Sequence, residues 1–104
     1  MSILPSRLGF GISGAHGTPL MAPGGTVRLV GQAFAAGVRV FDTAPAYGAG
    51  EAEKRLGRAL AYLPRSDVFV TTKAGVSSTG LARRIRDFSP EGVERSIRAS
   101  LSRL

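Results

Sequence analysis

Two charged residues each stand at the end of a run of mainly apolar and β-branched residues. Their spacing along the chain would allow them to share one site. Asp42 follows the run 38–41, and Lys73 follows the run 68–72. Such runs are typical of parallel strands. The two residues are 31 positions apart (73 minus 42), about the length of one strand–helix–strand unit. Because consecutive parallel strands usually lie side by side, both side chains are expected at the sheet edge where α/β folds hold their active sites.

A tyrosine follows the first of these strand ends. Tyr47 lies five positions after Asp42, in a loop that begins at the same edge. An ammonium group favours the phenolate form of a neighbouring tyrosine, and a carboxylate orients the lysine. Asp42, Tyr47 and Lys73 together therefore predict a tyrosine prepared for proton transfer. The alternatives are a structural ion pair and a packed loop aromatic.

Closely spaced glycines follow the first predicted strand, 7–11. Gly9, Gly11 and Gly14 match the pattern G-x-G-x-x-G, but a dinucleotide-binding fingerprint also needs an immediate helix and an acidic residue about 20 positions on. The following residues, Ala-His-Gly-Thr-Pro-Leu, do not start a helix, and the next acidic residue is Asp42. The glycines instead indicate backbone that a flat group can approach.

The composition excludes several classes of protein. A chain of 104 residues holds one domain at most. It has no cysteine and a single histidine, His16, which excludes a disulfide framework and predicts no metal site. His16 is expected to be solvated and is assigned no role. Without an apolar run of about 20 residues or a secretory signal, we expect a cytoplasmic protein that does not interact with membranes.

The chain is basic, with 14 Lys and Arg residues against 7 Asp and Glu residues and a net charge of +7. The arginines are scattered and are not interleaved with aromatic residues. This pattern favours a solvated surface and no nucleic-acid partner. A small basic domain that binds nucleic acid or another polyanion is the alternative function.

Strand-like and helix-like segments alternate along the chain. The expected strands are 7–11, 38–41 and 68–72, the last buried on both faces, and the expected helices are 26–36, 50–63 and 89–104. Residues 74–87 are expected to form a basic loop, with a helical turn near 81–85 as one option. Three strand–helix units give a parallel sheet with open edges. Since a full barrel of such units needs about 250 residues, the chain is expected to be the front part of a larger α/β fold.

Several of these segments resemble the aldo-keto reductase family. The most specific is Val-Phe-Asp-Thr-Ala-Pro-Ala-Tyr-Gly at 40–48, continued by Gly50, Glu51, Glu53 and Leu56-Gly57. Thr-Thr-Lys at 71–73 resembles the family's lysine strand, and Leu-Gly-Phe-Gly at 8–11 resembles its first strand. The segments 88–93 and 100–104 are similar to the aldose (fucose-type) dehydrogenase branch.

The resemblance implies a (β/α)8 TIM barrel that binds NADP or NAD without a Rossmann domain. Residues 1–104 would be the N-terminal part of this single barrel domain. Hydride would pass between the nicotinamide and the carbonyl or hydroxyl carbon of an aldose sugar or small aldehyde. Tyr47 would donate or accept the proton, Lys73 would assist it and Asp42 would hold Lys73. The cofactor would contact Asp42, Lys73 and the backbone around Gly11, Ile12 and Ser13.

One feature of the family has no counterpart in these residues. Its fourth catalytic residue is a histidine at the end of the next strand, and His16 is in the wrong place to replace it. We therefore expect the 104-residue polypeptide by itself neither to turn over substrate nor to bind the dinucleotide tightly. A truncated remnant that pairs with other chains through its open sheet edge is a third alternative.

Overall fold

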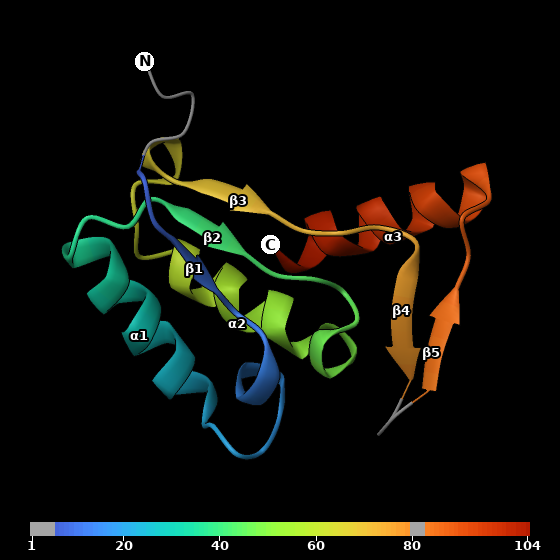
Figure 1. Ribbon diagram of the computed structural model, residues 1–104, viewed down its shortest axis with the longest axis horizontal. Coiled ribbons are helices and arrows are strands. Elements are labelled where there is room, and N and C mark those ends of the chain that lie inside the picture. Colours follow the sequence, from blue (N-terminus) through green and yellow to red (C-terminus); the bar gives the residue numbers. More distant parts are fainter. Residues whose placement is uncertain (1–5, 80–82) are drawn as a thin grey trace.

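The computed structural model describes residues 6–79 and 83–104, and a three-stranded parallel sheet in the order β1-β2-β3 lies at its centre (Figure 1). The strands are β1 (Gly9–Gly11), β2 (Val40–Asp42), β3 (Phe69–Thr71), β4 (Val76–Thr79) and β5 (Arg83–Arg86). The helices are α1 (Pro23–Ala35), α2 (Glu51–Leu60) and α3 (Pro90–Arg103), with short 3-10 turns η1 (Gly14–Gly17), η2 (Tyr47–Gly50) and η3 (Arg65–Asp67). The predicted succession of three strand–helix units is confirmed.

The helix ends follow local chemistry. α1 begins at Pro23, three residues before the predicted start, because a proline at the first helical position already has a helical φ. Gly37 stands just after the end of α1 with φ 102°, a conformation that favours glycine. α3 begins after Ser89, whose hydroxyl accepts a 3.0 Å hydrogen bond from the Gly92 amide.

One face of the sheet carries the core. Phe10, Phe41 and Val70 lie in register across the three strands, and α1 and α2 pack over them. The buried apolar residues of this layer are Ile12, Val30, Phe41, Ala52, Leu56, Ala59, Leu60 and Val68. Burial of this apolar surface between two helices and the sheet is the main stabilising term of the fold.

The opposite face of the sheet is open in the part of the chain that the structure describes. Its central row is Gly11, Asp42 and Thr71, and Phe69 in the next row is 45% exposed. The expectation that strand 68–72 is buried on both faces is therefore wrong for this chain. Its β-branched residues predicted the strand, but α1 and α2 cover only the face that carries Val70.

The segment 74–87 is not the predicted loop. β4 and β5 form an antiparallel hairpin in which Val76 pairs with Arg86 and Thr79 with Arg83. The optional helical turn near 81–85 is also wrong over residues 83–85, which belong to β5, and Leu81 lies outside the described residues. Both strands are polar, so they lack the apolar alternation by which a half-buried strand is recognised. Pairing satisfies backbone groups that a loop would leave to water.

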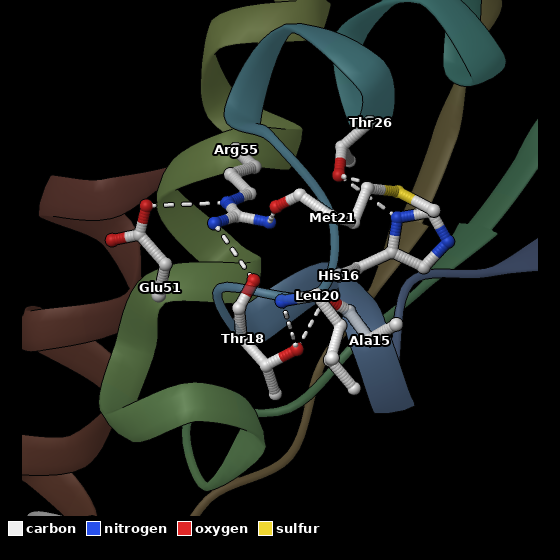
Figure 2. A network of polar contacts seen from close by, with 8 residues as sticks. All are labelled: Ala15, His16, Thr18, Leu20, Met21, Thr26, Glu51 and Arg55. Carbon is white, nitrogen blue, oxygen red and sulfur yellow. Dashed lines mark hydrogen bonds and ion pairs between the residues drawn. The ribbon is translucent and has the colours of Figure 1, made fainter.

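The connection between β1 and α1 is anchored to α2 by a buried arginine (Figure 2). The Arg55 guanidinium donates to the backbone oxygens of Met21, at 2.8 Å, and Thr18, at 3.4 Å. Its Nε also donates to Glu51 at 3.2 Å. Because Arg55 is only 5% exposed, these partners replace the water that its charge loses on burial.

His16 belongs to the same connection and is not the solvated residue that the sequence predicted. Its Nδ1 lies 2.9 Å from the hydroxyl of buried Thr26, which also contacts the Met21 sulfur at 3.5 Å (Figure 2). The imidazole packs edge-on against Phe10, with ring centroids 6.0 Å apart. Burial, with a smaller contribution from Arg55, lowers the pKa of His16. Its partners come from α1 and β1, so the local sequence did not reveal them.

The last helix is only partly covered. Arg103 on α3 forms a 2.7 Å ion pair with fully buried Glu53 on α2, whereas Ile97 and Leu101 on α3 are 47% and 72% exposed. Across the residues described, no helix has the length and apolar character needed to cross a membrane.

Candidate active site

Asp42 and Lys73 meet at the carboxyl ends of β2 and β3. The Lys73 ammonium donates to Asp42 Oδ2 at 3.2 Å and to the backbone oxygen of Thr43 at 2.9 Å. The parallel pairing of the two strands, with Asp42 opposite Thr71, brings the lysine to this position. Both side chains remain about half exposed, so they are open to a ligand at the rim.

Lys73 is held in its charged form. Partial burial acts to lower the pKa of Lys73, but the hydrogen bond and charge of Asp42, helped by Tyr47, outweigh it and raise that pKa. An opposite charge at hydrogen-bond distance favours the ammonium over the neutral amine. At neutral pH the site therefore holds a fixed positive charge beside the tyrosine.

Tyr47 comes to the same place from the loop after β2. The Lys73 ammonium lies 5.3 Å from the centroid of the half-buried Tyr47 ring. All three residues that the sequence predicted as catalytic are thus neighbours in space. The arrangement puts a phenol, an ammonium and a carboxylate in a row at one edge of the sheet.

Two contacts that the sequence did not predict hold the tyrosine loop. The Ser78 hydroxyl on β4 donates to the backbone oxygen of Ala46 at 2.9 Å and accepts from the Ala49 amide at 3.1 Å. On the other side, a Cβ added to Gly17 would lie 2.8 Å from the Gly48 Cα, so two glycine backbones pack directly together. Neither contact has a local sequence signal, because each joins segments about 30 residues apart.

Neighbouring threonines fix the carboxylate and the strand ends. The Thr71 hydroxyl donates a hydrogen bond to Asp42 Oδ1, which leaves Oδ2 for the lysine. Buried Thr43 donates its hydroxyl to the Ile12 backbone oxygen at 3.0 Å, tying β1 to the residue after Asp42. The Thr-Thr-Lys sequence at 71–73 was the one signal for the first of these contacts.

The buried carboxylate of Glu53 is hydrogen bonded to the segment that carries Lys73. Glu53 on α2 accepts a hydrogen bond from the Thr72 hydroxyl at 2.7 Å with one oxygen and from Arg103 at 2.7 Å with the other. Thr72 directly precedes Lys73. Glu53 therefore connects α2 and α3 to the backbone that carries the lysine.

The predicted cofactor-binding backbone lies at the end of β1. Gly11 is in register with Asp42, and a Cβ added there would meet no atom within 4 Å. This open, exposed surface fits a flat ring approaching beside Asp42, and Ser13 is exposed next to it. Ile12 is fully buried, and its amide and carbonyl are already bonded to Asp42 O and Thr43 Oγ1. Ile12 would therefore contribute a rigidly held backbone to the cofactor site, rather than a free amide or carbonyl group.

Comparison with known proteins identifies the family. Residues 7–104 match the sequence profile of the aldo/keto reductase family. The chain belongs to the aldo/keto reductase family. It is 38% identical to a probable aldo-keto reductase of Glycine max and 44% identical to L-galactose dehydrogenase of Arabidopsis thaliana, each over 95% of this chain. A D-threo-aldose 1-dehydrogenase of a Pseudomonas species is 40% identical over 69% of the chain.

Solved structures show the same relationship. A glycerol dehydrogenase from Gluconobacter oxydans superposes with a TM-score of 0.81 and 33% identity, over 95% of this chain and 32% of that one. An aldo-keto reductase from Bacillus halodurans gives a TM-score of 0.80 and 27% identity, also over 32% of its chain. The three strand–helix units are therefore part of a TIM barrel of this family.

The chain corresponds to the N-terminal portion of such a barrel. It spans 29% and 30% of the length of the two plant relatives. The predicted resemblance, including its aldose dehydrogenase branch, is confirmed.

Proposed function

We propose that residues 1–104 are the N-terminal part of one barrel domain of an NAD(P)-dependent oxidoreductase that acts on an aldose sugar or a small aldehyde. The observation that carries the proposal is the position of the Lys73 ammonium, 3.2 Å from Asp42 Oδ2 and 5.3 Å from the Tyr47 ring centroid. If Asp42 and Lys73 formed only a structural ion pair, the phenol of Tyr47 would not be needed beside them. Relatives named as L-galactose and D-threo-aldose dehydrogenases support the substrate class.

The bound nicotinamide would supply the hydride acceptor or donor. Gly11, Ser13, Asp42 and Lys73 would border it, with Ile12 fixing the backbone between them. In the reducing direction the Tyr47 phenol donates its proton to the carbonyl oxygen, and in the oxidising direction the phenolate accepts the hydroxyl proton. Lys73 stabilises the negative charge on the phenolate oxygen, and Asp42, itself held by Thr71, keeps the ammonium in place.

The ion pairs argue for a small-molecule substrate over a nucleic acid. Arg55, Arg95, Arg98 and Arg103 each pair with a carboxylate in the described structure. Paired arginines cannot neutralise phosphates without losing those partners. These four arginines are therefore not free to bind a polyanion.

The test is a turnover assay of the native gene product that contains these residues, whatever its full length. NADPH or NADH oxidation is followed with methylglyoxal and glyceraldehyde, and NADP or NAD reduction with L-galactose and L-fucose. Tyr47→Phe is expected to lower kcat by about 10²–10⁴-fold with little change in KM. Tyr62→Phe is the matched control, because this second tyrosine is 81% exposed. Equal activity of the two variants would refute the proposal.

The isolated 104-residue chain gives a separate expectation. We propose that it neither turns over these substrates nor binds the dinucleotide tightly, because it supplies three strand–helix units of the site. Dinucleotide-dependent turnover by the isolated chain that is lost in Tyr47→Phe would contradict this part of the proposal alone.

A further inference from the structure

β5 is an arginine-rich strand without acidic partners. Its sequence is Arg83-Arg84-Ile85-Arg86, and all four residues are exposed. Within residues 6–79 and 83–104, none of the three arginines forms an ion pair. The nearest carboxylate along the chain, Asp87, is already paired with Arg95 at 2.8 Å. Three cationic side chains in four residues therefore give this strand a positive charge that no carboxylate of the described residues offsets by an ion pair.

The hairpin register divides these arginines between two faces. Arg84 pairs with Ser78 and Arg86 pairs with Val76. Residues directly opposite in an antiparallel pair lie on the same face, and neighbours along a strand alternate. Arg84 and Arg86 therefore share the face of Ser78, whereas Arg83 lies on the other face.

The Ser78 side chain is turned toward the loop that carries Tyr47. The Ser78 hydroxyl bonds the backbone of Ala46 and Ala49, on either side of the Tyr47-Gly48 pair. At the other end of the hairpin, the Asp87 amide donates to the Gly75 oxygen at 2.8 Å, two residues after Lys73. Figure 1 shows the hairpin standing beside the loop that follows β2. β4 is thus tied to the Tyr47 loop, and the residue that follows β5 is tied to the loop after Lys73. β5 is joined to this framework as the partner strand of β4.

The chemistry of the strand indicates a small anion. Alternate residues of a strand lie about 7 Å apart, so Arg84 and Arg86 can direct two guanidinium groups at one group. A guanidinium matches the geometry of a carboxylate or phosphate with two parallel hydrogen bonds. We propose that Arg84 and Arg86 bind the phosphate or carboxylate of the substrate whose carbonyl or hydroxyl carbon reacts at Tyr47. This inference rests on the proposed function and names its substrate class: anionic aldehydes or sugar derivatives.

A matched substrate pair tests the proposal in the native gene product. The kcat/KM values of D-glyceraldehyde 3-phosphate and D-glyceraldehyde are compared in the wild type, the double variant Arg84→Ala/Arg86→Ala and the control Arg83→Ala. The ratio of phosphorylated to neutral substrate is expected to fall about 10–100-fold in the double variant, because charge-assisted hydrogen bonds are lost. Arg83→Ala should leave the ratio within about twofold, since Arg83 lies on the opposite face.

The dinucleotide is the other source of phosphate at this rim. If the double variant instead raises the KM for the dinucleotide and lowers kcat/KM equally for both aldehydes, the arginines serve the cofactor and the proposal is overturned. An equal loss of the ratio in Arg83→Ala would also overturn it, because the effect would then be one of net charge.

A binding measurement separates this proposal from the proposed function. Amide shifts of residues 76–79 and 83–86 are recorded by NMR during titration with glyceraldehyde 3-phosphate. Shifts that are present in the wild type and in Arg83→Ala but lost in the double variant support the anion site, even if no aldehyde is turned over and the proposed function fails. No shifts in the wild type, or shifts produced only by a single-stranded oligonucleotide, would overturn it.

Discussion

Glu53 on α2 and Arg103 on α3 are fifty positions apart in the sequence and form a 2.7 Å ion pair. Glu53 also accepts a hydrogen bond from Thr72, the residue before Lys73. Glu53 is fully buried, and Arg103 is 21% exposed. Arg103→Met would leave a buried carboxylate without its countercharge, which is expected to cost about 3 kcal/mol of unfolding free energy. Arg98→Met removes an exposed pair from the same helix and should cost less than about 1 kcal/mol. Urea unfolding of the native gene product measures both, and equal losses would contradict a structural role for the buried pair.

The Asp42–Lys73 pair predicts a shift in the pH profile of the enzyme. Asp42 raises the pKa of Lys73, so Asp42→Asn should lower that pKa. Because the proposed reaction uses the protonated lysine, the alkaline limb of the kcat/KM profile is expected to move to lower pH. Asp67→Asn, in η3 and away from the site, is the control. An unmoved alkaline limb in Asp42→Asn would show that Lys73 ionisation does not limit the reaction.

His16 predicts a loss of stability in mild acid. Burial and Arg55 lower the pKa of His16 in the folded chain, so the unfolded chain binds the proton more readily. Stability is therefore full at pH values above the ordinary histidine pKa and falls as the pH drops through it toward the folded value. The difference in unfolding free energy between about pH 7.5 and about pH 5.5 should be smaller in His16→Gln than in the wild type.

An NMR titration checks this prediction directly. The His16 ring resonances are assigned by their loss in His16→Gln, so the titration reports this one group. Their midpoint should lie below that of the unfolded chain in urea. A midpoint at or above the unfolded value would contradict the burial and hydrogen bonding described for His16.

The contact between Gly17 and Gly48 predicts sensitivity of the tyrosine loop to one methyl group. A Cβ on Gly17 would lie 2.8 Å from the Gly48 Cα, so Gly17→Ala should displace the loop, with a cost of about 1–3 kcal/mol in stability and a reduced kcat. Gly31→Ala in the interior of α1 would meet no atom within 4 Å. It should stabilise the protein by about 0.5–1 kcal/mol. Calorimetric unfolding and steady-state kinetics measure both variants.

Some parts of this protein follow from the sequence by itself. Strand ends and the order of strand–helix units depend on residues close together along the chain, so the runs before Asp42 and Lys73 were informative. The spacing of Asp42 and Lys73 predicted that they would meet, because consecutive parallel strands lie side by side. Tyr47 joined them through its short distance from Asp42.

Other parts were decided only by the tertiary structure. The partners of His16, the support of Lys73 by Glu53 and the seating of Ser78 on the Tyr47 loop each join segments that the sequence separates widely. The hairpin of β4 and β5 escaped prediction because polar strands gain their stability from cross-strand pairing rather than from a periodic apolar face. Local patterns encode local backbone preferences, whereas long-range contacts arise when the sheet and its helices pack.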